Sequence, residues 1–209
     1  MENKRVTAAF CQGKELSPRC AQIINAALEL LSTEGMAGLT IKNLAQAVGV
    51  SEPALYRHFE NKQGILVAIL DHFETHMHDL FGKALDSETG ALDQLRAVYR
   101  RVFQGFAAQP ALASVVFAEE IFRHDQRLAE RVAHIMDMVE GRILNLMRSR
   151  KGRAECRQDV PAKDLARVVM GSLRFLVTRW RLSGHAFDLE KEGMAFWRSL
   201  RQMIAVPTQ

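Results

Sequence analysis

Apolar residues recur at helical spacing along almost the whole chain, and no stretch sustains the alternation that predicts a β-strand. Ser17 and Pro18 form a pair favoured at the N-cap and first position of a helix. The apolar residues that follow share one stripe, made of Cys20, Ile24, Ala27, Leu28 and Leu31. This pattern predicts a first helix with Cys20 in its core, which ends at Gly35 because glycine readily adopts the left-handed conformation.

Two short helices are predicted next, each with its own cap. Thr40 caps the first of them, whose inner face is Ile41, Leu44, Ala45 and Val48 and which ends at Gly49. Ser51 caps the second, which carries Leu55 and Phe59 inward. Helices this short are not stable alone. Both must therefore pack against the first helix, in a compact three-helix unit.

The remainder of the chain predicts longer helices. One starts at Asn61 and runs to about residue 83, and others span 91–108, 111–122, 125–150, 161–183 and 188–205. The polar, charged segment 148–159 is predicted to be a flexible loop. We expect an all-α protein of about nine helices. A helix-turn-helix domain covers residues 1–62, with a flexible arm over 1–16, and a helical bundle covers residues 63–209.

Composition narrows the class of protein. The 209 residues are 48% hydrophobic and 25% charged, which is typical of a globular chain. Three cysteines without a CxxC pair argue against a disulfide framework or a zinc cluster. No apolar run approaches the roughly 20 residues of a membrane span, and the N-terminal segment lacks the apolar core of a secretory signal. We expect a cytoplasmic protein that does not bind membranes.

Catalytic and metal-binding motifs are not evident. The sequence has no GxSxG, phosphate-binding loop, dinucleotide fingerprint or paired carboxylates, so we predict neither an enzyme nor a cofactor. His72 and His76 could share a helix face, but no HExxH pattern or thiol cluster accompanies them, and we predict no metal. Cys11, Cys20 and Cys156 could sense oxidants only if one of them were exposed with a depressed pKa.

The short helix that begins at Ser51 suggests contact with DNA. Packing of its inner face leaves residues 51–58 outward, and a projecting helix fits the major groove. By helical phase Ser51, Glu52, Ala54 and Arg57 would face outward, whereas Thr40, Tyr56, His58 and Lys62 could reach phosphates. Charge adds little to the argument for DNA binding. The net charge is only +4, and residues 1–62 hold seven Lys and Arg against six Asp and Glu. A helical hairpin that merely packs is the alternative.

The same stretch resembles the DNA-binding domain of TetR/AcrR-family transcriptional regulators. The matching residues are Thr40, Ala45, Gly49-Val50-Ser51, Leu55-Tyr56-Arg57-His58-Phe59 and Asn61-Lys62. The resemblance implies a homodimer that binds a palindromic operator in double-stranded DNA. The implied DNA contacts are Thr40, Lys42, Ser51, Glu52, Pro53, Ala54, Tyr56, Arg57, His58 and Lys62. Glu52-Pro53 departs from the family, which commonly has a basic residue and then a small one there.

The resemblance also implies a ligand cavity and a dimer interface in the C-terminal bundle. Candidate pocket residues are Phe103, Phe106, Phe117, Arg174 and Trp180, although aromatic residues at helical spacing are usually core. Candidate interface residues are Leu165, Val168, Ser172, Phe196, Trp197, Leu200 and Ile204. We expect a repressor released from its operator by a small apolar or amphipathic effector. The alternatives are a DNA-binding protein controlled by a protein partner, a helical interaction module and an unrecognised helical enzyme.

Overall fold

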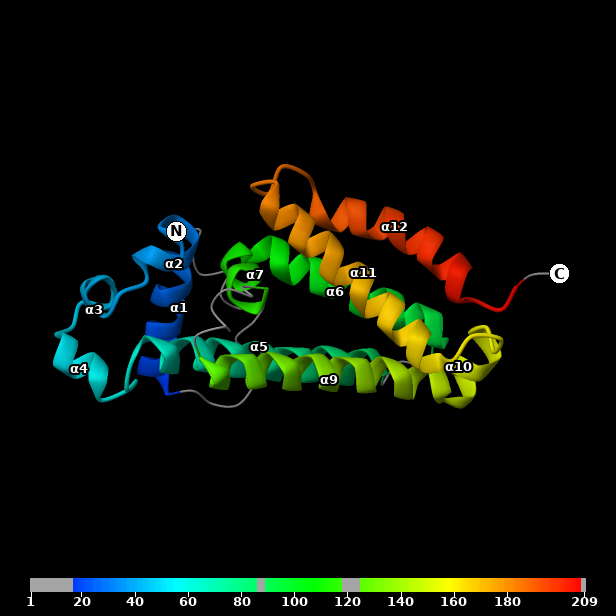
Figure 1. Ribbon diagram of the computed structural model, residues 1–209, viewed down its shortest axis with the longest axis horizontal. Helices are drawn as coiled ribbons and strands as arrows, with labels where there is room; N and C mark the ends of the chain where they lie inside the picture. Colours follow the sequence, from blue (N-terminus) through cyan, green and yellow to red (C-terminus); the bar gives the residue numbers. More distant parts are fainter. Residues whose placement is uncertain (1–16, 86–88, 118–124, 208–209) are drawn as a thin grey trace. The chain divides into compact units, whose positions relative to one another are not determined.

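The computed structural model describes residues 17–85, 89–117 and 125–207 (Figure 1). Within these ranges the chain forms eleven helices and no β-strand, which confirms the all-α prediction. Contacts divide the chain into two compact units: unit 1 comprises residues 1–76 and 108–133, and unit 2 comprises residues 77–107 and 134–209. The functional division at residue 62 stays a prediction, and the predicted arm over 1–16 lies outside the described residues.

Unit 1 contains the predicted three-helix arrangement. Its helices are α1 (Pro18–Thr33), α2 (Gly35–Gly38), α3 (Ile41–Val48), α4 (Glu52–Tyr56) and α7 (Pro110–Val116), together with the first part of α5 (Lys62–Leu85) and the start of α9 (Gln126–Arg148). Helix α1 packs against α2, α3 and α7, and α3 packs against α4. Leu44, Leu55 and Ile65 are completely buried. The two short helices are thus held by packing against longer ones.

Unit 2 contains α6 (Ala91–Ala108), α10 (Arg150–Glu155), α11 (Ala162–Leu182) and α12 (Leu189–Ile204), with the remaining parts of α5 and α9. Helices α11 and α12 pack against each other. Tyr99 of α6 lies between two aromatic rings, 4.8 Å from Phe103 and 5.2 Å from Trp197 of α12 between ring centroids. These three side chains are almost fully buried and form an aromatic core.

The segment over 148–159 is not the flexible loop that its polar composition predicted. It contains α10, which Ser149 caps by accepting a hydrogen bond from the Gly152 amide at 3.1 Å. The residues after α10 are tied to the C-terminal end of the chain, since the Arg157 amide donates to the Ile204 carbonyl and the Val206 amide donates to that of Glu155. Backbone pairing with residues about fifty positions away is invisible to a local sequence pattern.

Other element boundaries also differ from prediction. The helix expected over 111–122 ends at Val116, and residues 118–122 lie outside the described ranges. The helix expected to continue to Arg150 ends at Arg148, because Ser149 starts α10. The four-residue helix α2 was not predicted, and with α10 it raises the number of helices above nine. Cys20 is only half-buried rather than part of the core.

Candidate nucleic-acid interface

The start of α3 is fixed by side-chain hydrogen bonds. The Thr40 hydroxyl accepts a hydrogen bond from the Asn43 amide at 3.1 Å, as expected of an N-cap. The Asn43 side chain in turn donates to the Gly38 carbonyl at 2.9 Å. The sequence did not predict the hydrogen bond from Asn43 to Gly38, because it depends on α2. Together the two bonds fix the direction in which α3 leaves the preceding turn.

The turn between α3 and α4 requires a glycine. Gly49 has φ +72°, in the left-handed region, and a side chain there would be strained. Its amide and that of Val50 donate back to carbonyls of the last turn of α3. Ser51 then accepts from the Ala54 amide at 3.4 Å and begins α4. Two capped helices therefore meet at a sharp, hydrogen-bonded turn (Figure 1).

Helix α4 is shorter than the predicted 51–58 segment. It ends at Tyr56 and Arg57 is its C-cap. The amides of His58 and Phe59 both donate to the Leu55 carbonyl, at 3.0 and 3.1 Å, so the backbone keeps turning after the helix ends. Leu55 is completely buried and Phe59 half-buried, while Tyr56 is 51% exposed. The inward and outward faces of this segment agree with the predicted phase.

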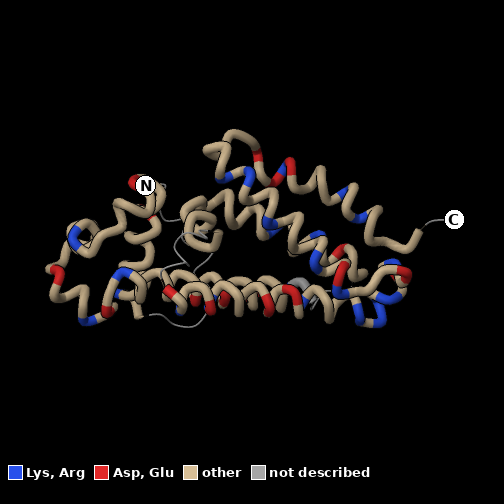
Figure 2. The backbone as a smooth tube through the Cα atoms, viewed as in Figure 1, with Lys and Arg blue, Asp and Glu red and all other residues tan. Residues whose placement is uncertain are grey.

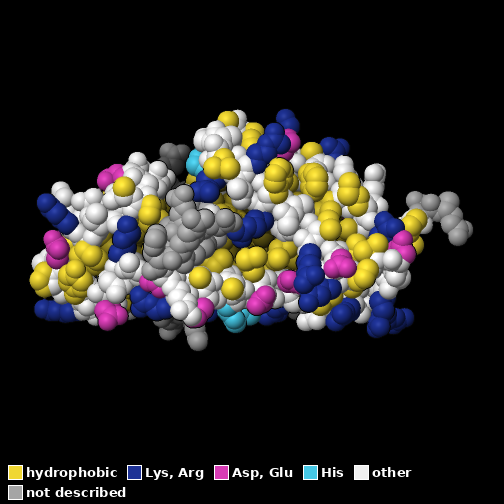
Figure 3. Space-filling model, viewed as in Figure 1, with side chains coloured by type: hydrophobic (Ala, Val, Ile, Leu, Met, Phe, Trp, Pro, Cys, Tyr) yellow, Lys and Arg dark blue, Asp and Glu magenta, His cyan; other side chains and the backbone are white. Residues whose placement is uncertain are grey.

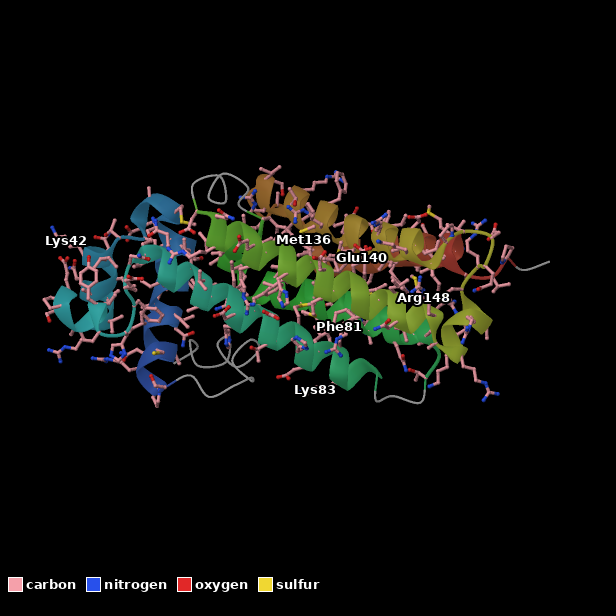
Figure 4. All side chains as sticks on the ribbon, turned by 60° about the horizontal axis from the view of Figure 1, so that its bottom comes forward. Lys42, Phe81, Lys83, Met136, Glu140 and Arg148 are labelled. Atoms are coloured by element: carbon pink, nitrogen blue, oxygen red, sulfur yellow. The ribbon has the colours of Figure 1, made fainter. Side chains whose placement is uncertain are left out.

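Most of the predicted DNA contacts are available at the surface. The exposed ones are Thr40, Lys42, Ser51, Glu52, Pro53, Tyr56, Arg57 and His58, and Ala54 is half-buried. Figure 4 shows Lys42 on α3, with its side chain at the surface of unit 1. Figure 2 shows basic and acidic positions interspersed along this part of the chain. The surface therefore offers side chains of mixed charge, with a protruding tyrosine and arginine.

Lys62 has a structural contact that the sequence did not indicate. Its ammonium donates to the Met36 carbonyl at 2.8 Å and joins the start of α5 to α2. Burial lowers the pKa of this ammonium from its usual value. The Asn61 side chain accepts from the Gly64 amide at 2.9 Å and caps the same helix end. Lys62 thus has a part in holding unit 1 together, besides its predicted approach to phosphate.

The cysteines and histidines singled out in the sequence lie in different surroundings. The Cys20 sulfur is 3.9 Å from Nδ1 of His58, so these two residues meet beside the α4 segment. Burial raises the pKa of the Cys156 thiol to about 11, which opposes formation of the reactive thiolate. Cys11 lies outside the described residues. His72 is buried in α5.

The predicted pocket residues are mostly core. Phe103, Phe106 and Trp180 are buried in unit 2, and Phe117 is buried in unit 1. Arg174 is half-buried, and its guanidinium lies 3.6 Å from the sulfur of Met136. The open groove of unit 2 that is lined by α6, α10 and α12 includes none of these five residues. A role for them in ligand binding stays a prediction.

The predicted interface residues fall into two groups. Leu165, Trp197, Leu200 and Ile204 are buried within unit 2, and Ser172 is half-buried and bonded to the Tyr99 hydroxyl at 3.1 Å. Val168 is 48% exposed and Phe196 half-buried. Phe175 and Leu182, the most exposed apolar residues of this region, were not predicted as interface residues. Val168, Phe175 and Leu182 follow one another at intervals of seven residues, and this spacing was the signal that could have found them.

The described helices show no membrane-spanning character. None of them is both long enough and apolar enough to cross a bilayer.

Two capped helices that meet at a left-handed glycine, with the second exposing its outer face, define a helix-turn-helix protein of the DNA-binding class. Comparison with protein families agrees: residues 23–69 match the model of "Bacterial regulatory proteins, tetR family", and residues 69–202 match "YsiA-like protein, C-terminal region". The chain belongs to the TetR family of regulators.

Similar proteins extend over nearly the whole chain. The nucleoid occlusion factor SlmA of Vibrio atlanticus is 28% identical over 193 residues, which cover 92% of this chain and 98% of that protein. The fatty acid degradation regulator FadR of Bacillus halodurans has a TM-score of 0.75 at 21% identity, covering 91% and 96% of the two chains. FadR of Bacillus subtilis, solved in complex with stearoyl-CoA, has a TM-score of 0.69 at 19% identity, covering 90% and 98%. These structural likenesses establish the fold.

Proposed function

We propose that the chain is a homodimeric, cytoplasmic repressor that binds a palindromic operator through α3 and α4 and leaves it when a small apolar or amphipathic effector binds the C-terminal bundle. The observation that supports DNA binding most directly is the turn at Gly49, whose φ of +72° directs the capped helix α4 outward. In this proposal Ser51, Glu52 and Arg57 face bases. Thr40, Tyr56 and His58 hold the phosphates, which fixes the register on the duplex.

Dimerisation supplies the second recognition helix. Val168, Phe175 and Leu182 lie seven residues apart on α11 and are 48%, 64% and 74% exposed. Met203 of α12 is 55% exposed, and Figure 3 shows apolar side chains at the surface over α11 and α12. Apolar positions at this spacing form one stripe along a helix. We infer that this stripe, rather than the buried Trp197 and Leu200, forms the interface, and that a symmetric dimer buries it.

The dimer is tested by the mass of the full chain in solution. Light scattering after size-exclusion chromatography should give twice the chain mass of 23.6 kDa. Phe175→Asp should yield a monomer, since it places a charge in the stripe. Arg148→Asp, a charge change at an exposed site on α9, is the control and should leave the dimer intact (Figure 4). A monomeric unmodified chain would refute this part of the proposal.

DNA binding is tested by selecting duplexes from a random pool with the full chain and measuring affinity for the selected sequence. A palindrome with half-sites about one helical turn apart is expected. Tyr56→Ala with Arg57→Ala should weaken binding by at least about tenfold and reduce its dependence on salt. Arg148→Ala with Arg150→Ala removes two charges from α9 and α10 and should change affinity less than twofold. Failure to enrich any duplex at low salt would refute DNA binding.

Release of the operator by an effector is tested by measuring operator affinity with and without a bound ligand. Since a FadR neighbour was solved with stearoyl-CoA, that compound is a reasonable first probe, with free coenzyme A as the control. Binding that favours a second conformation lowers operator affinity by the ligand's differential affinity, typically about 5- to 150-fold. The proposal predicts such a loss with stearoyl-CoA and none with coenzyme A. Unchanged operator affinity at saturation by bound stearoyl-CoA would argue against release by an acyl ligand.

Control by a protein partner is the second candidate. The SlmA relatives favour it, because they are named nucleoid occlusion factors and align with 92% of this chain. If a protein partner controls the chain, the chain binds many genomic sites, and it does not need a small molecule to leave its DNA. Genome-wide mapping of bound sites distinguishes the two: a repressor should occupy few promoters, whereas an occlusion factor should occupy sites dispersed along the chromosome.

A further inference from the structure

Unit 2 contains an open groove of about 1390 Å³ that the sequence did not predict. It is lined by the N-terminal half of α6, by the end of α10, by one face of α12 and by the C-terminal residues 205–207. Small-molecule pockets usually enclose about 300–1,000 Å³, so this groove is large for such a ligand. The backbone pairing of residues 155–157 with 204–206 fixes one of its walls.

The groove is rich in cations without partners. Arg96 comes from α6, while Lys191, Arg198 and Arg201 come from one face of α12. Within the described ranges the side chains of these four residues make no ion pair and no hydrogen bond. Cations gathered on one surface repel one another and attract an anion. The lining as a whole, which also includes Arg100, holds five basic residues against the four acidic residues Asp93, Glu155, Asp188 and Glu190, so the groove is weakly positive.

The acidic residues of the groove are mostly engaged elsewhere. Glu190 pairs with Arg100 at 3.4 Å and accepts from Gln104 at 3.0 Å. Glu155 accepts from the Leu92 amide at 2.9 Å, and Asp188 caps α12 by accepting from the Lys191 amide at 2.9 Å. Each of these carboxylates serves the fold. Their presence nevertheless makes the groove less positive than a surface that binds a densely charged phosphate backbone.

The floor of the groove is partly apolar. Trp197 contributes to it and is 2% exposed, and Met194, one turn earlier on α12, is half-buried. The Trp197 indole N–H is buried and has no acceptor within the described part of the chain. A tryptophan N–H usually has a partner when buried. The groove thus combines cationic side chains with a partly apolar floor, and the Trp197 indole lies buried beside it.

We propose that this groove binds an acidic peptide segment of a partner protein, in which carboxylate side chains alternate with apolar ones. Arginine binds carboxylates in a two-pronged geometry, and Arg96, Arg198 and Arg201 supply guanidiniums from two helices. Apolar side chains of the segment cover Met194 and the floor beside Trp197. An extended chain suits an open groove of this volume, and the apolar floor at Met194 favours a peptide with apolar side chains over a nucleic acid. The site does not depend on DNA binding by unit 1.

The test uses the full chain without DNA and a fluorescein-labelled decapeptide of alternating glutamate and leucine. Its control is the same peptide with glutamine in place of glutamate. Fluorescence anisotropy should detect binding of the acidic peptide, weakened at least tenfold in the control. Arg198→Ala with Arg201→Ala should weaken binding by about tenfold or more. Arg148→Ala with Arg150→Ala removes two exposed arginines outside the groove and should change it less than twofold.

A second measurement locates the peptide. The chain has two tryptophans, so Trp180→Phe leaves Trp197 as the sole indole, and its emission should change when the acidic peptide binds. Equal binding of both peptides would overturn the proposal, as would equal effects of the two arginine double variants. The proposal would also be overturned if millimolar inorganic phosphate displaced the peptide. The same holds if random duplex DNA displaced it and bound through Arg198 and Arg201. The groove would then be a site for free anions or for nucleic acid.

Discussion

The α3–α4 segment of unit 1 and the α6–α12 contact of unit 2 are stabilised in different ways. In the first, three side-chain caps and one left-handed glycine direct the chain, and most side chains that would perform its function are exposed. In the second, Tyr99, Phe103 and Trp197 pack at centroid distances near 5 Å and are almost completely buried. Local hydrogen bonds shape one region, and close packing between distant residues shapes the other.

This difference shows where each region tolerates change. A residue exposed on α4 can be replaced without disturbing the core, so recognition of a new DNA sequence need not cost stability. A residue in the aromatic core of unit 2 has neighbours on every side, and any change in volume or polarity affects packing. Variants of the two regions should therefore separate into those that alter DNA affinity and those that alter folding.

The largest expected effect on the free energy of unfolding comes from the buried Tyr99 of unit 2. Burial raises the pKa of Tyr99 to about 12, from the usual value near 10. The unfolded chain therefore ionises first, and stability that is present below pH 10 is lost as the pH rises toward 12, by roughly 3 kcal/mol. Urea denaturation of the chain and of Tyr99→Phe between pH 9 and 12 measures this loss as the difference between them. A pH-independent difference would show that Tyr99 ionises as freely when folded.

The next effect tests the close packing of α12 against α6. A Cβ on Gly193 would collide with the Phe103 ring, whereas Gly141 of α9 has open space around it. Gly193→Ala should lower the free energy of unfolding by about 1–3 kcal/mol through overpacking. Gly141→Ala is the matched control and should be neutral or stabilising by up to about 1 kcal/mol, since alanine favours helix. Thermal unfolding compares them, and equal effects would contradict the packing argument.

The smallest effect concerns the turn of unit 1. Gly49→Ala forces a side chain into the left-handed region and should cost about 1–2 kcal/mol. Gly49→Asn is the control, since asparagine tolerates this conformation better. Stability by urea denaturation and affinity for the selected duplex should both fall in the order glycine, asparagine, alanine. An alanine variant as stable as the asparagine variant would indicate that the turn is not held at this φ value.

The sequence predicted the helix-turn-helix segment well because its determinants are local. Thr40, Ser51 and Asp188 each cap the helix that follows them, and Gly49 has the expected positive φ. Segment 148–159 shows the limit of that approach. Its composition is that of a solvated loop, yet Ser149 starts a helix there and residues 155–157 pair with the C-terminal end of the chain.

By itself, the sequence determined the all-α class, most helix starts and the outward face of α4, since caps and periodicity act within a few residues. Only the tertiary structure decided which apolar residues are core and which are surface. Trp197 and Phe175 are both large aromatic residues on amphipathic helices, but one is 2% and the other 64% exposed. The groove of unit 2 likewise required α6, α10 and α12 together, because burial and charge clustering depend on residues that are distant in the chain.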